Sequence, residues 1–346
     1  MKEPLDGRTG VETPARASSP ATLRDPQGRR LDYLRLSVTD RCNLRCRYCM
    51  PAEGIELVRH EDVLSLEELR RLTALFADLG VRKIRITGGE PLVRKGVPHL
   101  LARLGRLPSR PEILLTTNGV LLADRLEDLR AAGVRRVNLS LDSLDRDTYR
   151  RITRRDELAR VLPLLDAIPA AGLGLKINVV VIPGLNDGEL RDFAALTRDR
   201  DLTVRFIEPM PFVGTAGGVC PAIGGDEILE RLRVDFALEA ALGGASSVEE
   251  LYAAPGHRGR IGIIRGHGRT FCAACSRLRL DARGRLRTCL YGIPAVDLGR
   301  LLRDGADTER LILAVRSAVA DRLVDGWAAE RGRGGGDLDS MARIGG

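Results

Sequence analysis

The sequence predicts an α/β fold in which a parallel sheet curves into a partial barrel and a smaller C-terminal domain follows. From Leu31 onward, short apolar runs typical of strands alternate with amphipathic stretches typical of helices, as in successive βα units around a parallel sheet. Unusual residues also follow the ends of several runs, as they do at the carboxyl face of an α/β barrel. We expect a barrel over residues 31–235 and a C-terminal domain over 236–346.

The pattern predicts six strands, joined by helices. The strands are expected at 33–39, 83–87, 112–117, 136–143, 175–182 and 203–209. The first helix should begin with a capping box formed by Ser65 and Glu68 and end at Gly80. Residues 1–30 are rich in Pro, Gly, Ser, Thr and Arg and lack apolar periodicity, so we expect a disordered N-terminal arm there.

Composition narrows the class of protein. The chain of 346 residues is 44% apolar, which excludes a wholly disordered protein, and its 55 basic against 47 acidic residues give a net charge of +8. A net positive charge of this size is compatible with binding to nucleic acid, with binding to phosphorylated small molecules, or with a role in solubility alone. No apolar run approaches the roughly 20 residues that span a bilayer. We therefore expect a cytoplasmic protein that does not associate with membranes.

Six of the seven cysteines fall into two groups, which in a reducing compartment favours metal ligands or redox groups over disulfides. The first group is Cys42, Cys46 and Cys49, spaced CxxxCxxC after the first predicted strand. A closed zinc site uses four ligands, whereas three thiolates on a [4Fe-4S] cluster leave one iron open to a small molecule. A zinc site with a distant fourth ligand is the alternative.

This spacing resembles the signature of the radical S-adenosylmethionine (SAM) superfamily, which places CxxxCxxC after the first strand of a partial (β/α)6 TIM-like barrel. The resemblance implies that SAM binds the open iron and that a reduced cluster cleaves it to a 5′-deoxyadenosyl radical. The turn "GGEP" (Gly88 to Pro91) is similar to the SAM-positioning turn of that superfamily. Glycines there permit close approach of the backbone to a ligand.

The second group is Cys272, Cys275 and Cys289, and again the spacing offers three ligands. Zinc is a stronger alternative here, with Cys220, His257 or His267 as a fourth ligand. Arg277 and Arg279 follow Cys275 and stand two residues apart, so their guanidinium groups can face a common anion. The pattern favours a second open cluster beside an anionic substrate.

Together the two groups make the chain from about Leu31 onward similar to the GTP 3′,8-cyclase family. The shared stretches include "LRLSVTDRCN", "IRITGGEPL", "TTNG", "NLSLDSL", "RFIEPM" and the terminal "RIGG". The resemblance implies a second [4Fe-4S] cluster that binds the guanine of GTP. It also implies abstraction of the ribose C3′ hydrogen to form (8S)-3′,8-cyclo-7,8-dihydroguanosine 5′-triphosphate, the first step of molybdenum cofactor biosynthesis.

The same resemblance assigns further residues. The implied GTP contacts are Arg35, Arg85, Thr116, Lys176, Arg277, Leu278 and Arg279. The implied SAM contacts are Tyr48, Gly89, Ser140 and Met210, and the tail residues Gly345 and Gly346 are implied to be catalytic. Lys176 also stands out without the resemblance, because it lies inside an apolar strand of a chain with only four lysines. Ser276 departs from the asparagine common in the family.

Partners follow from the same resemblance. We expect a flavodoxin- or ferredoxin-type electron donor, transfer of the product to cyclic pyranopterin monophosphate synthase, and a monomer or homodimer that binds no nucleic acid. Two other readings stay open. One is a radical SAM maturase of peptides or cofactors with an auxiliary cluster. The other is a zinc-binding RNA protein, which the 3% aromatic content disfavours because base stacking needs aromatic side chains.

Overall fold

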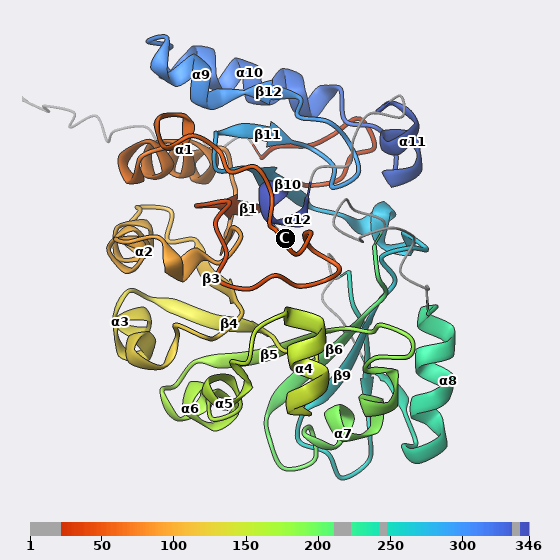
Figure 1. Cartoon of the computed structure of the whole chain (residues 1–346). Coiled ribbons are helices and arrows are strands. Elements are labelled where there is room, and N and C mark those ends of the chain that lie inside the picture. Colours follow the sequence, from red (N-terminus) through yellow and green to blue (C-terminus); the bar gives the residue numbers. More distant parts are fainter. Residues whose placement is uncertain (1–21, 211–222, 242–247, 334–339, 346) are drawn as a thin grey trace, which may run out of the picture.

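The computed structural model describes residues 22–210, 223–241, 248–333 and 340–345. Its strands form one sheet in the order β12-β11-β10-β1-β2-β3-β4-β5-β6-β9-β8-β7 (Figure 1). The strands are β1 (Tyr33–Ser37), β2 (Lys83–Thr87), β3 (Glu112–Thr117), β4 (Val134–Ser140), β5 (Gly174–Val180), β6 (Leu202–Ile207), β7 (Glu239–Ala241), β8 (Glu250–Ala253), β9 (Arg260–Ile264), β10 (Arg277–Leu280), β11 (Arg285–Arg287) and β12 (Val296–Asp297).

The centre of the sheet is parallel and its two edges are antiparallel. Strands β1 to β6 pair in chain order, β9 joins β6 in parallel, and β10 joins β1 in parallel. Hairpins β7-β8 and β11-β12 complete the edges in antiparallel fashion. The predicted α/β fold and its six strands are confirmed. The C-terminal part of the chain extends this sheet at both edges.

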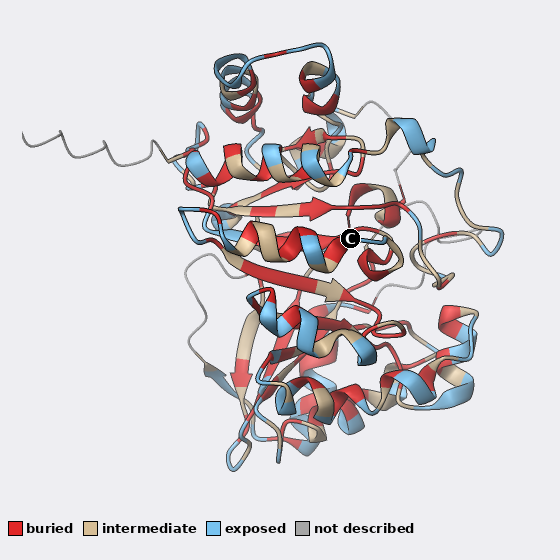
Figure 2. Cartoon of the chain, turned by 90° about the vertical axis from the view of Figure 1, so that its left-hand side faces the viewer, coloured by how far each residue is buried: buried red, intermediate tan, exposed pale blue. Residues whose placement is uncertain are grey.

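Most of the helices cover the outer side of the curved sheet, whereas α12 lies in the centre of the molecule, where Met341 and Ala342 line the pocket (Figure 1). The helices are α1 (Leu66–Asp78), α2 (Val97–Gly105), α3 (Leu126–Ala131), α4 (Arg146–Thr153), α5 (Leu158–Val161), α6 (Leu164–Ala170), α7 (Leu190–Ala195), α8 (Gly225–Asp235), α9 (Leu298–Arg303), α10 (Thr308–Ala320), α11 (Gly326–Arg331) and α12 (Met341–Ile344). Figure 2 shows exposed residues on the outward sides of the helices and buried residues on their inward sides. Within the described ranges, none of these helices is long and apolar enough to cross a membrane.

The predicted capping box of α1 is present. The Ser65 side chain accepts a hydrogen bond from the backbone N–H of Glu68, and the Glu68 carboxylate accepts one from the backbone N–H of Ser65. These two bonds satisfy N–H groups that the first turn of a helix otherwise leaves without partners. Gly80 follows the helix with a φ of +91°, the left-handed conformation that glycine adopts most readily.

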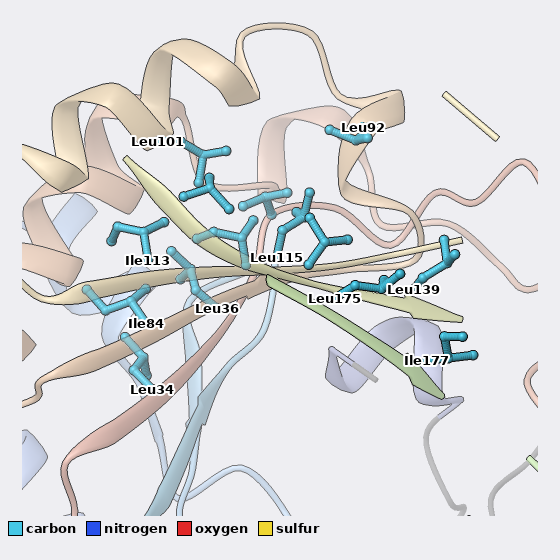
Figure 3. Packing of buried hydrophobic residues seen from close by; sticks show 14 of the residues in the cluster. Leu34, Leu36, Ile84, Leu92, Leu101, Ile113, Leu115, Leu139, Leu175 and Ile177 are labelled. Carbon is cyan, nitrogen blue, oxygen red and sulfur yellow. The ribbon is translucent and has the colours of Figure 1, made fainter. Parts of the chain in front are cut away.

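Alternation of side chains gives the central strands two chemically different faces. One face carries apolar residues such as Leu34, Leu36, Ile84 and Ile177, which belong to the main hydrophobic core and pack beneath the helices (Figure 3). The other face carries polar and basic residues, which are Arg35, Arg85, Thr87, Thr116, Asn138, Ser140, Lys176, Asn178, Arg205, Arg277 and Arg279. We call this second set the inner face.

Residues 22–30 differ from the disordered arm that the sequence predicted. Leu23 is buried, and its backbone N–H donates to the carbonyl of Leu79 at 3.4 Å while its carbonyl accepts from Leu31 at 2.9 Å. The apolar side chain of Leu23 joins the main core, which offsets the entropy lost on ordering this segment. The rest of the predicted arm, residues 1–21, lies outside the described residues.

The capping box generates a stability prediction. Ser65→Ala should lower the free energy of unfolding by about 1 kcal/mol, because an N-cap oxygen is lost. Anaerobic denaturant titration followed by circular dichroism measures the change. Ser317→Ala, an exposed position inside α10, is the matched control and should be neutral or slightly stabilising. An equal free energy of unfolding in the two variants would show that the cap does not stabilise the protein.

Candidate active site

Both cysteine triplets line a single pocket. Its wall includes all six cysteines that the structure describes, none of which is in a disulfide. The turns after β2, β3, β4 and β6 also contribute, through residues such as Gly89, Asn118, Asp142 and Met210. The expectation that motifs at the strand ends meet in one place is thus confirmed.

The two triplets lie toward opposite ends of one pair of strands. The first triplet follows the carboxyl end of β1, whereas Cys275 immediately precedes the amino end of β10. Because β10 runs parallel to β1 with Tyr33 opposite Arg277, the second triplet lies near the amino ends of this pair. Strand β1 has five residues, which at about 3.3 Å per residue span roughly 16 Å. The pocket therefore extends along the inner face between the triplets.

The first triplet sits in a partly buried loop. Cys46 accepts backbone hydrogen bonds from Cys49 at 2.9 Å and Met50 at 3.1 Å, and the Cys42 sulfur accepts one from the backbone of Leu44 at 3.4 Å. Burial raises the pKa of Cys42 to about 11 and that of Cys49 to about 12. A thiol with so high a pKa ionises near neutral pH when a coordinated metal ion supplies positive charge next to it. The raised pKa values therefore suit metal ligands.

The "GGEP" turn is pressed against this loop. The N–H of Gly89 donates to the carbonyl of Thr39, and the N–H of Glu90 donates to the carbonyl of Arg41, both at 2.8 Å. A Cβ atom on Gly89 would lie 2.3 Å from the carbonyl oxygen of Arg41, a distance at which the backbone has to move. Glu90 in turn accepts from the hydroxyl of Thr117 at 2.8 Å. Glycine is therefore required where the turn meets the cysteine loop.

The predicted SAM contacts Tyr48, Gly89, Ser140 and Met210 all line the pocket. Met210 lies on the side of the second triplet, where it packs with Tyr291 and Cys289. The Tyr48 hydroxyl donates to Asp142 at 2.8 Å, which fixes the orientation of the ring. Burial raises the pKa of Asp142 to about 6. Asp142 was not among the predicted site residues, although it lies in the "NLSLDSL" stretch that the chain shares with the family.

The inner face concentrates positive charge. Arg35, Arg205, Arg277 and Arg279 line the pocket. Within the described residues, five buried side-chain atoms of the inner face have no hydrogen-bond partner. They are Arg205 Nε and Nη2, Arg277 Nε, Asn138 Oδ1 and Asn178 Oδ1. Burial raises the pKa of Tyr33, but the charges of Arg85, Arg277 and Arg35 outweigh it and lower the pKa to about 7. Such a surface favours an anionic ligand.

The remaining predicted GTP contacts differ in position. Thr116 lines the pocket, and Arg85 lies behind it, bonded to the Tyr33 hydroxyl and to Thr116 Oγ1 at 3.4 Å. The side chain of Leu278 is fully buried in the core. Only its backbone is therefore available to a nucleotide.

Lys176 is paired with Glu249, a residue that the sequence analysis missed. The Lys176 ammonium contacts one carboxylate oxygen of Glu249, and Arg205 Nη1 lies 3.2 Å from the other. Burial lowers the pKa of Lys176. Burial would raise the pKa of Glu249, but the charges of Arg205 and Lys176 outweigh it and lower that pKa. No local pattern identifies Glu249. Arg205 was also missed, although an arginine inside an apolar strand, such as Arg35, is a signal that could have identified it.

The C-terminal tail reaches the pocket. The carbonyl of Gly345 accepts hydrogen bonds from Arg279 Nη1 at 3.0 Å and from Arg35 Nε at 3.3 Å. Upstream, the Ser340 hydroxyl donates to the carbonyl of Cys49 at 2.8 Å. The tail thus contacts both the first cysteine loop and the inner face. Gly346, the other predicted tail residue, lies outside the described residues.

The donor set of each triplet fits an iron-sulfur cluster. In the part of the chain that the structure describes, no group of three His, Cys, Asp or Glu side chains is arranged to hold a metal ion. A [4Fe-4S] cluster takes each thiolate on a different iron, so its cysteines need not converge on one point. Neither His257 nor His267 lines the pocket, and Cys220, the third candidate for a fourth ligand, lies outside the described residues.

Comparisons with known proteins agree with this geometry. The Radical SAM superfamily matches residues 36–197, and the family Molybdenum Cofactor Synthesis C matches residues 202–325. A GTP 3′,8-cyclase of Geobacter sulfurreducens is 49% identical over 80% of this chain and 85% of its own length. A GTP 3′,8-cyclase of Moorella thermoacetica is 43% identical over 94% of this chain and 100% of its own length. The chain belongs to the GTP 3′,8-cyclase family.

Solved structures support the fold of this family member. The crystal structure of Streptococcus suis SuiB matches 84% of this chain and 69% of its own, with a TM-score of 0.56 at 16% identity. A likeness at that identity speaks for the fold and not for the substrate. Together with the match to the Radical SAM superfamily, this likeness confirms the radical SAM type of α/β fold expected from the sequence.

The contact between the turn and the loop generates a prediction. Gly89→Ala should remove SAM binding and halve the iron content, because the added Cβ displaces the loop that carries the first triplet. Anaerobic iron analysis and equilibrium dialysis with SAM measure both effects. Gly188→Ala is the matched control, since nothing lies within 4 Å of a Cβ at that position. Normal SAM affinity in Gly89→Ala would show that the turn does not position SAM.

Proposed function

We propose that this chain is a GTP 3′,8-cyclase, a radical SAM enzyme that converts GTP into (8S)-3′,8-cyclo-7,8-dihydroguanosine 5′-triphosphate in the first step of molybdenum cofactor biosynthesis. The observation that carries the proposal is the single pocket lined by two cysteine triplets and by the inner-face arginines Arg35, Arg205, Arg277 and Arg279. The family membership supports the same activity. A pocket of this kind suits a substrate that is both a metal ligand and a polyanion.

Two [4Fe-4S] clusters and SAM are the cofactors. Cys42, Cys46 and Cys49 would hold the first cluster, and Cys272, Cys275 and Cys289 the second. When bound, the first cluster and SAM would supply a 5′-deoxyadenosyl radical that takes the hydrogen from ribose C3′. Tyr48, Gly89, Ser140 and Met210, all on the pocket wall, would orient SAM.

GTP binds between the two triplets. Its guanine faces the second triplet beside Arg277, the backbone of Leu278 and Arg279. Its triphosphate and ribose meet Arg35, Thr116 and Lys176, with Arg85 behind Thr116. Hydrogen bonds between guanidinium groups and phosphate oxygens are among the strongest in proteins, and partial burial strengthens them further. The tail residue Gly345 completes the site from the direction of the first cysteine loop, and we propose that Gly346 acts with it in catalysis.

The decisive experiment is an assay of the reconstituted protein. The chain is incubated anaerobically with SAM, dithionite and GTP, and the nucleotide product is identified by mass spectrometry. An isomer of GTP, formed with equimolar 5′-deoxyadenosine, is the expected result. Formation of 5′-deoxyadenosine with unchanged GTP would point to a maturase that acts on another substrate. A colourless protein with stoichiometric zinc would overturn the proposal.

The proposal extends to partners and location. A flavodoxin- or ferredoxin-type protein donates the electron, and the product passes to cyclic pyranopterin monophosphate synthase. The protein acts in the cytoplasm as a monomer or homodimer, and binds neither nucleic acid nor membranes. An electron donor is needed because SAM cleavage consumes an electron. A following enzyme is needed because the cyclised nucleotide is only the first intermediate of the pathway.

Separate roles for the two triplets give a test by mutation. Cys42→Ala should abolish reductive SAM cleavage, because the first cluster is not assembled. Cys289→Ala should spare SAM cleavage more than cyclisation, because the second cluster binds only the nucleotide. Quantifying 5′-deoxyadenosine and cyclised product in the same reactions separates these effects. Equal loss of both products in Cys289→Ala, with the first cluster intact, would refute the division of roles.

The basic inner face gives a binding prediction. Lys176→Ala should weaken GTP binding about tenfold, since a hydrogen bond to a charged group contributes about 1.5 to 3 kcal/mol. The affinity for SAM should stay the same. Isothermal titration calorimetry of the reconstituted protein measures both, with Lys83→Ala, at the exposed start of β2, as the matched control. An unchanged GTP affinity would remove Lys176 from the site.

A further inference from the structure

Two buried charged residues of the segment 22–31 lie beside the second triplet. The Asp25 side chain is fully buried and accepts hydrogen bonds from Arg29 Nε at 2.6 Å and from Arg322 Nη1 at 3.2 Å. Arg322 itself is only 3% exposed at its side chain. Burying a guanidinium requires a compensating negative group, and Asp25 provides one. Arg322 is thereby held in one orientation.

Arg29 joins this pair to the second cysteine loop. Its Nη1 donates to the carbonyl of Cys272 and to that of Val324, both at 2.8 Å, and its Nη2 donates to the carbonyl of Leu323 at 3.1 Å. The backbone N–H of Gly326 then donates to the Cys272 sulfur at 3.4 Å. The turn between α10 and α11 is thus fixed against the loop that carries Cys272 and Cys275.

Arg322 lines the same pocket as Cys272 and Cys275. One oxygen of the Asp25 carboxylate accepts from Arg322 Nη1 at 3.2 Å and from Arg29 Nε at 2.6 Å, and Arg29 Nη1 in turn donates to the Cys272 carbonyl at 2.8 Å. The buried guanidinium of Arg322 is therefore joined through Asp25 and Arg29 to the loop that carries Cys272 and Cys275.

We infer that Arg322, held by Asp25, is a positioning residue and counter-charge for the second iron-sulfur cluster. This inference rests on the proposed role of Cys272, Cys275 and Cys289 as cluster ligands. A [4Fe-4S] core of charge 2+ with three thiolates has a net charge of about −1, and GTP adds further negative charge next to it. A buried cation on the pocket wall beside the second triplet offsets the charge of the cluster and raises its reduction potential, since charge and hydrogen bonds near the sulfurs set that potential.

The test isolates the second cluster. In a Cys42→Ala background the reconstituted chain carries the second cluster alone, and a potentiometric titration followed by electron paramagnetic resonance gives its reduction potential. Arg322→Met in this background should shift the potential to more negative values, and Arg322→Lys should restore much of the shift. Arg316→Met, which removes an exposed arginine of α10, is the matched control and should leave the potential unchanged.

The outcomes separate the inference from the proposed function. If the Cys42→Ala chain binds no iron although it is folded, the cluster assignment of the second triplet fails. If the cluster assembles and Arg322→Met has the same potential as the control, the assignment stands and the role of Arg322 is overturned. Should Arg322→Met not assemble the cluster, Arg322→Gln, which keeps the donors and removes the charge, replaces it in the same comparison.

Discussion

The alternation of side chains along the central strands is the constraint on which the other features depend. The apolar face takes up the contacts with the helices, so the opposite face of the same strands is left without an apolar core to fill it. Arginine, lysine and asparagine occupy that face, and within the described residues five buried atoms of its arginines and asparagines have no hydrogen-bond partner, namely Arg205 Nε and Nη2, Arg277 Nε, Asn138 Oδ1 and Asn178 Oδ1. A buried polar atom without a partner costs about 1 to 3 kcal/mol. A strand pattern of this kind is therefore tolerated where a ligand completes it.

The pairing of β1 with β10 turns this inner face into a site with two ends. In that register Arg35 lies opposite Arg279, so one guanidinium from each half of the chain meets at the same level. The cysteine loops leave the strand pair in opposite directions, one beyond the carboxyl end of β1 and one before the amino end of β10. The two cysteine groups consequently face each other along the strands, with the arginines between them. The space enclosed is long enough for a nucleotide rather than for a single small ion.

Local sequence predicted the central strands, the capping box of α1 and the cysteine groups, because each of these is encoded within a few consecutive residues. It did not reveal that β9 and β10 join the two edges of the sheet, since such pairing depends on residues far apart in the chain. For the same reason Glu249, Arg29 and Arg322 were not selected. Leu23 was misjudged because one apolar residue in a polar stretch carries no periodicity, although its burial orders the segment.

Charge balance on the inner face explains why these side chains are held as they are. Glu249 gives Lys176 and Arg205 an acidic partner, and the carbonyl of Gly345 gives Arg35 and Arg279 an acceptor with no net charge. The face therefore keeps an excess of positive charge, which is also what lowers the pKa of Tyr33 to about 7. Repulsion among buried cations raises the free energy of the folded chain. A bound polyanion relieves that repulsion, so part of its binding energy comes from charges that the fold has already brought together.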